Sequence, residues 1–199
     1  MDDGGYNSFV ILSVTTERWI DVATSNMDAV LVDHAHCEKK AAASAMSLVV
    51  GYPELEELVR RMSALAIEEL QHFRAVFERI VQRGLALGRD QGDPYAKKLM
   101  ALARVNQGRQ GRLTDRLLLF GLIEARSHER LDLLATHLEA PDLKRFYADL
   151  ARAESRHAAL FRELACLYDD PEAVDDRLSE LASAEAGIVA ALPIEPRIH

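Results

Sequence analysis

The chain has 199 residues, of which 49% are hydrophobic and 6% aromatic, and its formal net charge at pH 7 is −8. A chain of this length can bury a sizeable core, and its many Ala, Leu, Glu and Arg residues favour helix, so we expect one all-helical domain over residues 1–199. Its two cysteines, Cys37 and Cys166, belong to no Cys-x-x-Cys pair, which argues against a disulfide framework and against a rubredoxin-type iron site.

No membrane segment or secretory signal is expected. The apolar run at residues 9–14 is too short to cross a bilayer, and no later run reaches about 18 apolar residues. The chain begins Met1-Asp2-Asp3, without the basic stretch that opens a secretory signal. We therefore expect a soluble protein of the reducing cytoplasm.

Start and stop signals divide the chain into an irregular lead-in and seven helices. Residues 1–15 are expected to be irregular, with residues 9–12 packed on the helices, and Thr16 can cap a short helix that begins near Glu17 and is anchored by Trp19. Glycine and proline mark most of the later boundaries. The later helices are expected at about residues 26–50, 53–87, 94–106, 112–138, 142–168 and 171–192.

A duplicated pattern of carboxylates and imidazoles runs through the four long helices. Each copy has a lone glutamate in an apolar seam and, about one helix later, a Glu-x-x-His pair whose two side chains lie one turn apart on one helix face. The offset between the copies is 86 residues for the lone glutamates and 85 for the pairs. The pattern indicates a duplicated metal half-site. Its members are Glu38, Glu69 and His72 in the first half-site and Glu124, Glu154 and His157 in the second.

The spacing also predicts that each half-site converges. Within each copy the lone glutamate and the pair lie roughly 21–26 Å from the turn between their helices, at about 1.5 Å rise per residue. In an antiparallel hairpin they therefore meet at one height. Burying four carboxylates without a cation would cost many kcal/mol. The alternative is interhelical salt bridges with two incidental histidines, but the seams carry no Lys or Arg at matching depth.

The donor types predict which metal is bound. Carboxylates with one imidazole per ion suit iron or manganese better than copper or structural zinc, and the set matches the dinuclear carboxylate sites of ferritin-like bundles. We predict one ion per half-site, with Glu69 and Glu154 as bridges. Six protein ligands for two ions leave coordination positions open, as dioxygen activation requires. We therefore predict two iron ions, with dioxygen as the co-substrate for attack on a C–H bond.

Four residues near the pattern have open roles. His34 precedes Glu38 by one turn and is either a hydrogen-bonded core histidine or a pocket residue beside the metal. Ser127 either borders an open metal face or bonds to the carbonyl one turn back. Glu68 either supports the ligands or is a surface charge. His128 lies off the seam and is a weak candidate for a third histidine ligand.

One segment has a charge opposite to that of the whole chain. Residues 79–116 contain nine basic and three acidic residues, a net +6, whereas the remainder has 15 basic and 29 acidic residues, a net −14. This basic segment is either a solvated helical face or a docking surface for a polyanion. For docking, the candidate substrate-binding residues are Arg104, Arg109, Arg112 and Arg116.

The six ligands, in order over about residues 26–168, resemble those of the ferritin-like non-haem di-iron carboxylate superfamily. The size, the repeat offset, the extra C-terminal helix and the His36-Cys37-Glu38-Lys39-Lys40-Ala41 context look most like the tRNA hydroxylase family. That resemblance implies a ferritin-like four-helix bundle with a long crossover between its second and third helices. It also implies a monooxygenase that hydroxylates the isopentenyl group of methylthio-isopentenyladenosine in tRNA, supplied with electrons by a reductase.

Two other functions remain open within the superfamily. A di-iron hydroxylase of a quinone or another small molecule would carry similar ligands, but a quinone enzyme needs an apolar membrane-facing helix. An iron-storage ferritin would assemble into a hollow shell. His36 points away from the seam, and its position on the helix predicts that it faces solvent.

Overall fold

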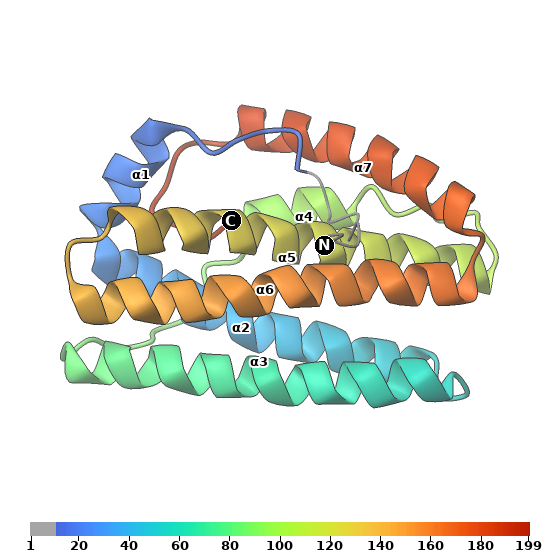
Figure 1. Cartoon of the computed structure of the whole chain (residues 1–199), viewed down its shortest axis with the longest axis horizontal. Coiled ribbons are helices and arrows are strands. Elements are labelled where there is room, and N and C mark those ends of the chain that lie inside the picture. Colours follow the sequence, from blue (N-terminus) through green and yellow to red (C-terminus); the bar gives the residue numbers. More distant parts are fainter. Residues whose placement is uncertain (1–10) are drawn as a thin grey trace, which may run out of the picture. The chain divides into compact units, whose positions relative to one another are not determined.

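In the computed structural model residues 11–199 are described, and they form seven helices and no strand. The helices are α1 (Glu17–Thr24), α2 (Met27–Gly51), α3 (Glu56–Gln82), α4 (Pro94–Met100), α5 (Arg109–His137), α6 (Pro141–Tyr168) and α7 (Pro171–Ala191) (Figure 1). The all-helical prediction is confirmed. Most expected boundaries agree within three residues; α3 and α4 are shorter than expected.

The described chain forms two compact units. The α2–α3 unit comprises residues 21–92 and 195–198, and the α5–α6 unit comprises residues 11–20, 93–194 and 199. Each unit contains one of the two expected hairpins and therefore one half-site. The expectation of a single domain over residues 1–199 stays a prediction.

The α2–α3 unit is built on an antiparallel pair of helices joined by a short turn at residues 52–55 (Figure 1). α3 ends earlier than expected because Gly84 adopts a left-handed conformation, with φ of +69°. The Gly84 N–H donates to the Val81 carbonyl at 2.9 Å, and the Leu85 N–H donates to the Ile80 carbonyl at 3.0 Å. This glycine cap closes the helix, and an irregular link follows over residues 83–92.

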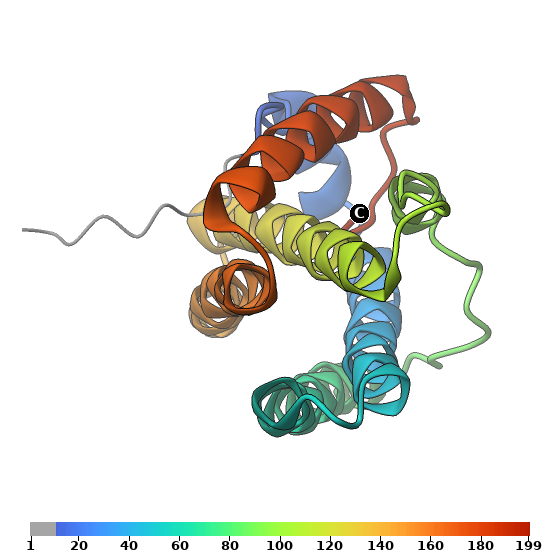
Figure 2. The ribbon, with the colours of Figure 1, turned by 90° about the vertical axis from the view of Figure 1, so that its right-hand side faces the viewer.

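In the α5–α6 unit a second antiparallel pair is joined at residues 138–140, and α7 packs against α4, α5 and α6. Figure 2 shows α7 crossing α5. Aspartate side chains cap the N-termini of α4 and α7. Asp93 accepts the Ala96 N–H at 2.9 Å, and Asp170 accepts the Ala173 N–H at 3.0 Å. Proline at the first helical position follows both caps.

The segment after α4 is not helical to residue 106 as expected, because it is held by a buried carboxylate of α5. Asp115 is fully buried and accepts the Arg104 backbone N–H at 2.7 Å. The Arg104 guanidinium lies 2.8 Å from the same carboxylate, and Arg177 of α7 lies 3.0 Å from it. One buried charge therefore joins three segments of this unit.

A second buried ion pair joins α5 to α7. Arg126 and Glu185 are both 0% exposed, and their closest side-chain atoms lie 2.9 Å apart. The Tyr95 hydroxyl of α4 donates to the same carboxylate at 3.1 Å. Arg126 also pairs with Glu129, whose carboxylate accepts the Thr15 backbone N–H at 2.6 Å. Asp115 and Arg177 also form an ion pair between the same two helices, and because buried charges need partners, these pairings fix how α5 and α7 meet.

Two expectations are wrong. His36 was expected to face solvent but is 4% exposed, because the link after α3 passes over it and its Nε2 lies 3.3 Å from the Leu87 carbonyl. Leu12, expected to pack on the helices, is 57% exposed. The packing expected for Phe9 and Val10 lies outside the described residues. Trp19 is buried as expected, beneath the guanidinium of Arg130 at 4.9 Å from the ring centre.

Candidate metal centre

The first half-site lies in the α2–α3 unit and converges as the spacing predicts. Glu38 of α2 and Glu69 and His72 of α3 each offer a ligand atom, and these atoms lie within 4.8 Å of one another. The His72 Nδ1 lies 3.4 Å from a Glu69 carboxylate oxygen and 3.7 Å from a Glu38 oxygen. Glu69 is 0% and Glu38 4% exposed. Two oxygen donors and one nitrogen donor therefore point to one place in a buried region.

The electrostatics of this half-site favour a cation. Burial alone would raise the pKa of Glu38, but the attraction and hydrogen bond of His34, with further bonds from His72 and Glu69, hold it well below its usual range. Burial alone would lower the pKa of His72, but Glu38 and Glu69 raise it to about 10. Without a metal, positive charge on imidazole offsets the two carboxylates. A metal ion would take over that role and displace the proton.

The second half-site lies in the α5–α6 unit and repeats the same donor set. Glu124 of α5 and Glu154 and His157 of α6 offer ligand atoms within 4.8 Å of one another. The His157 Nδ1 lies 3.3 Å from a Glu154 oxygen, and both of these residues are 2% exposed. The depth argument from sequence therefore holds in both hairpins.

His34 and Glu68 lie beside the first half-site in different ways. The His34 Nε2 is 2.6 Å from a Glu38 oxygen, and the ring is 1% exposed. This contact favours the interpretation of His34 as a residue that orients a ligand carboxylate. A Glu68 oxygen lies 3.9 Å from the Nε2 of His72, and its side chain is 38% exposed. Glu68 is thus a peripheral charge within reach of the imidazole.

Two α5 residues near Glu124 have partners that the sequence did not suggest. The Ser127 hydroxyl bonds to the imidazole of His199, the last residue of the chain, rather than to its own helix. The His128 Nδ1 lies 2.8 Å from the Ala151 carbonyl of α6. His128 is not among the described groups whose ligand atoms come together, so its proposed role as a third histidine ligand gains no support.

The four candidate arginines of the basic segment differ in their surroundings. Arg104 is engaged with Asp115 through its side chain and backbone. Arg116 lies over the Phe120 ring, 5.8 Å from its centre. Arg109 and Arg112 lie at the start of α5, where Arg112 donates to the Gln107 carbonyl at 2.7 Å. Much of the charge of Arg104 is therefore already offset inside the unit.

Sequence reasoning missed the charged groups that are paired within the units. Asp115 was counted only in the balance of the basic segment, and neither Arg126–Glu185 nor His199 was singled out. The one signal for the buried pair was the position of Arg126 among apolar residues of α5, since a guanidinium there requires a carboxylate partner.

Comparisons with known proteins decide the family. The family model of the tRNA-(MS2IO6A)-hydroxylase (MiaE) matches residues 6–199. A relative from Pseudomonas putida, named tRNA 2-(methylsulfanyl)-N(6)-isopentenyladenosine(37) hydroxylase, is 35% identical, with 93% of this chain and 89% of the relative covered. The chain belongs to the MiaE family.

Other relatives agree with this assignment. A Salmonella typhimurium protein of the same name is 28% identical, with 93% of this MiaE-family chain and 85% of that protein covered. A solved structure from Synechococcus, named "Protein 43 with aldehyde deformylating oxygenase activity", matches with a TM-score of 0.88 and 36% identity, over 95% of this chain and 94% of the other. The ferritin-like fold expected from the sequence is confirmed.

Among residues 11–199 of this MiaE-family protein, no helix combines the length and the apolar character needed to cross a bilayer.

Proposed function

We propose that this protein is a non-haem di-iron monooxygenase that hydroxylates the isopentenyl side chain of methylthio-isopentenyladenosine in tRNA. The observation that carries the proposal is the duplicated donor set, in which two carboxylates and one imidazole converge within 4.8 Å in each hairpin. Family membership and the names of two relatives support the substrate. The name of the similar Synechococcus protein supports oxygen chemistry on this fold.

The residues fit iron by their chemistry. Glu38, Glu69 and His72 would hold one ion, and Glu124, Glu154 and His157 would hold the other. Hard oxygen donors with one imidazole per ion suit iron. When bound, the iron pair supplies the activation of dioxygen that C–H hydroxylation needs.

The protein's own side chains prepare the donors. His34, at 2.6 Å, orients the Glu38 carboxylate and keeps it ionised, so that it is ready to bind a cation. The low exposure of the glutamates keeps bulk water from competing for the ligand positions. His72 must lose its ring proton for a nitrogen to act as a ligand, so metal binding and proton release are coupled at this position.

The stoichiometry implies a second partner. Hydroxylation places one atom of dioxygen in the product and the other in water, and this balance consumes two electrons and two protons. Isopentenyladenosine is not the source of these electrons, so an electron-donating reductase is part of the proposal. Because tRNA is the substrate, the proposed location is the cytoplasm.

The side of the molecule that receives tRNA is proposed from charge. The basic segment has a net charge of +6 in an acidic chain, and phosphate contacts supply much of the affinity for nucleic acid. Arg109, Arg112 and Arg116 are the proposed phosphate-binding residues. Arg104 is a weaker candidate, because Asp115 already holds it.

Mass spectrometry of tRNA nucleosides tests the proposal. Cells with the gene should contain the hydroxylated nucleoside, and cells without it should accumulate the unhydroxylated precursor. Complementation with wild-type protein should restore the product, and complementation with Glu69→Ala or Glu154→Ala should not. An unchanged nucleoside profile in the deletion strain would exclude this substrate. Assembly of the purified protein into a hollow shell would instead favour iron storage.

A further inference from the structure

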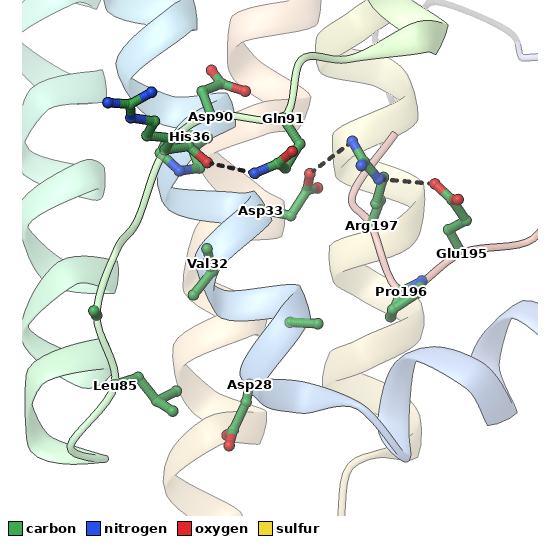
Figure 3. A pocket seen from close by; sticks show the side chains of 13 residues that line it. Asp28, Val32, Asp33, His36, Leu85, Asp90, Gln91, Glu195, Pro196 and Arg197 are labelled. Carbon is green, nitrogen blue, oxygen red and sulfur yellow. Dashed lines mark hydrogen bonds and ion pairs between the residues drawn. The ribbon is translucent and has the colours of Figure 1, made fainter.

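A pocket of 540 Å³ lies within the α2–α3 unit, outside the half-site of that unit. Its walls come from α2, from the link after α3 and from the C-terminal tail. Figure 3 shows Val32 and His36 on α2, Leu85 and Gln91 on the link, and Pro196 on the tail around this space. Its volume is within the range of small-ligand sites, and like them it combines apolar walls with a few polar groups.

One residue of the pocket wall, His36, has a buried ring nitrogen that lacks a hydrogen-bond partner among residues 11–199. His36 is 4% exposed, and its Nε2 lies 3.3 Å from the Leu87 carbonyl. A carbonyl can only accept, so Nε2 carries a hydrogen, and in the tautomer with its single hydrogen there Nδ1 is an acceptor. Among the described residues Nδ1 has no hydrogen-bond partner. Buried polar atoms of this kind are rare, so a ligand that donates an N–H or O–H fits here.

His36 does not belong to the metal half-site. It precedes Glu38 by two residues, which places the two side chains about 200° apart around α2. His34, by contrast, is one turn from Glu38 and touches it at 2.6 Å. His36 therefore lies on a different face of α2 from the half-site.

Each carboxylate that lines the pocket has a partner of opposite charge, whereas Arg89 has none among the described residues. Four carboxylates line the pocket. The Asp28–Arg83 distance is 2.6 Å, and Asp90 lies 3.6 Å from Lys40 and 3.7 Å from Lys39. Arg197 lies 2.9 Å from Glu195 and 3.7 Å from Asp33. The Arg89 guanidinium lines the same pocket, is exposed, and has no ion-pair partner among the described residues.

We propose that this pocket binds a nucleotide of the tRNA other than the one that is hydroxylated. The apolar side chains contact its base, His36 Nδ1 accepts a hydrogen from a base amino group or ribose hydroxyl, and Arg89 binds its phosphate. A nucleotide combines these three features, and RNA is commonly recognised through unstacked bases and ribose hydroxyls. The inference rests on the proposed function and extends it, because it adds a second contact to the same substrate.

Binding of an anticodon stem-loop RNA, measured by fluorescence anisotropy at several salt concentrations, tests the proposal. Arg89→Ala should weaken binding about fivefold and flatten the plot of log K against log salt by roughly one unit, because one phosphate contact is lost. His36→Leu should weaken binding by a similar factor without changing the slope, because a neutral contact is lost. Arg74 is an arginine of α3 outside the pocket. Arg74→Ala removes the same charge and should change neither the affinity nor the slope.

A small probe separates the pocket from the rest of the RNA surface. Adenosine 5′-monophosphate should bind the wild-type protein, and Ala86→Trp, which fills the pocket, should abolish that binding. Arg89→Ala should remove the preference for the monophosphate over adenosine. Metal content and thermal unfolding are measured for each variant, because His36 shares α2 with a metal ligand.

The outcomes distinguish the two proposals. If wild-type protein binds and modifies the RNA while Arg89→Ala, His36→Leu and Ala86→Trp all bind it normally, the pocket assignment is overturned and the proposed function stands. If wild-type protein does not bind the RNA, the proposed function fails and this inference fails with it. Equal weakening by Arg74→Ala would also overturn it, since the effect would then be general electrostatics.

Discussion

The Ser127 hydroxyl lies 2.8 Å from the Nε2 of His199, although the two residues are 72 positions apart. The His199 Nδ1 lies 3.1 Å from the Asp93 carboxylate, and the ring stacks on Tyr95 at 5.3 Å between centres. A carboxylate accepts, so Nδ1 carries a hydrogen, and in the tautomer with its single hydrogen there the Ser127 hydroxyl donates to Nε2. His199 is therefore held on α5, one turn after the proposed metal ligand Glu124.

This contact predicts a measurable coupling. Ser127→Ala leaves a buried imidazole nitrogen unsatisfied and should lower the free energy of unfolding by about 1 kcal/mol. His199→Ala should have an effect of similar size, and the double variant should lose less than the sum. Denaturant unfolding of the four proteins gives the coupling energy. Ser179→Ala, on the exposed side of α7, is the control, and additive effects would show that the contact contributes nothing.

Removing one of the proposed ligands Glu69 and Glu154 should remove the metal. Glu69→Ala and Glu154→Ala should each lose bound iron and hydroxylation, whereas wild-type protein supplied with iron should melt higher than the metal-free form. At a free metal concentration of 100 times Kd, metal binding to the folded protein raises the free energy of unfolding by about 2.7 kcal/mol. Metal analysis and thermal unfolding with and without iron measure both effects.

Glu78→Ala is the matched control, because Glu78 is a glutamate of α3 outside the half-site. It should keep the metal, the activity and the metal-dependent rise in melting temperature. If Glu69→Ala and Glu154→Ala behaved like this control, the assignment of the ligands would be wrong.

The buried Arg126–Glu185 pair predicts an asymmetric mutational response. Glu185→Leu leaves the guanidinium of Arg126 buried beside only part of its compensating charge and should cost about 3–5 kcal/mol of stability. Replacing both residues with Leu should recover much of this loss, because the buried guanidinium is removed together with its partner and Glu129, whose side chain is 15% exposed, can still reach solvent. Denaturant unfolding measures both variants against Glu172→Leu, a surface change on α7. A double variant no better than Glu185→Leu would contradict the argument.

Asp115 predicts an acid-dependent stability. Burial by itself raises the pKa of Asp115, but hydrogen bonds from Arg177 and Arg104 hold it below its usual range. Its ionised form therefore stabilises the folded state above the unfolded pKa of about 3.9, and this stability is lost as the pH falls through the lower folded-state pKa. The stability difference between wild type and Asp115→Asn should be constant above about pH 5 and shrink in acid. Asp176→Asn, a change at an exposed position of α7, should show a difference near zero throughout.

The basic segment predicts a salt-dependent contribution to tRNA binding. Arg109→Glu combined with Arg112→Glu should weaken tRNA binding and reduce the slope of log K against log salt by roughly one unit per lost phosphate contact. Hydroxylation of a free isopentenyl nucleoside should fall much less, because the metal site is untouched. Arg145→Glu with Arg152→Glu, on α6, is the matched control. Unchanged tRNA affinity would mean that the basic segment is only a solvated surface.

The sequence by itself determined the two half-sites. The three-residue spacing of Glu69 and His72 places both on one face of a helix, and equal distances from a turn bring the lone glutamate to the same height. These relations depend only on helical rise and rotation, which are the same in every α-helix. The same regularity explains why the bounds of α5, α6 and α7 were close to those expected.

Only the tertiary structure decided which groups pack over those helices. The position of His36 on α2 predicted exposure, but the link after α3 covers it, and that link follows no helical period. Ser127 bonds to His199, which is 72 residues later in the sequence. Asp115 pairs with Arg177, which is 62 residues later. Periodicity assigns a side chain to a face of its own helix, whereas its partner depends on the path of irregular segments and on how helices distant in sequence pack together.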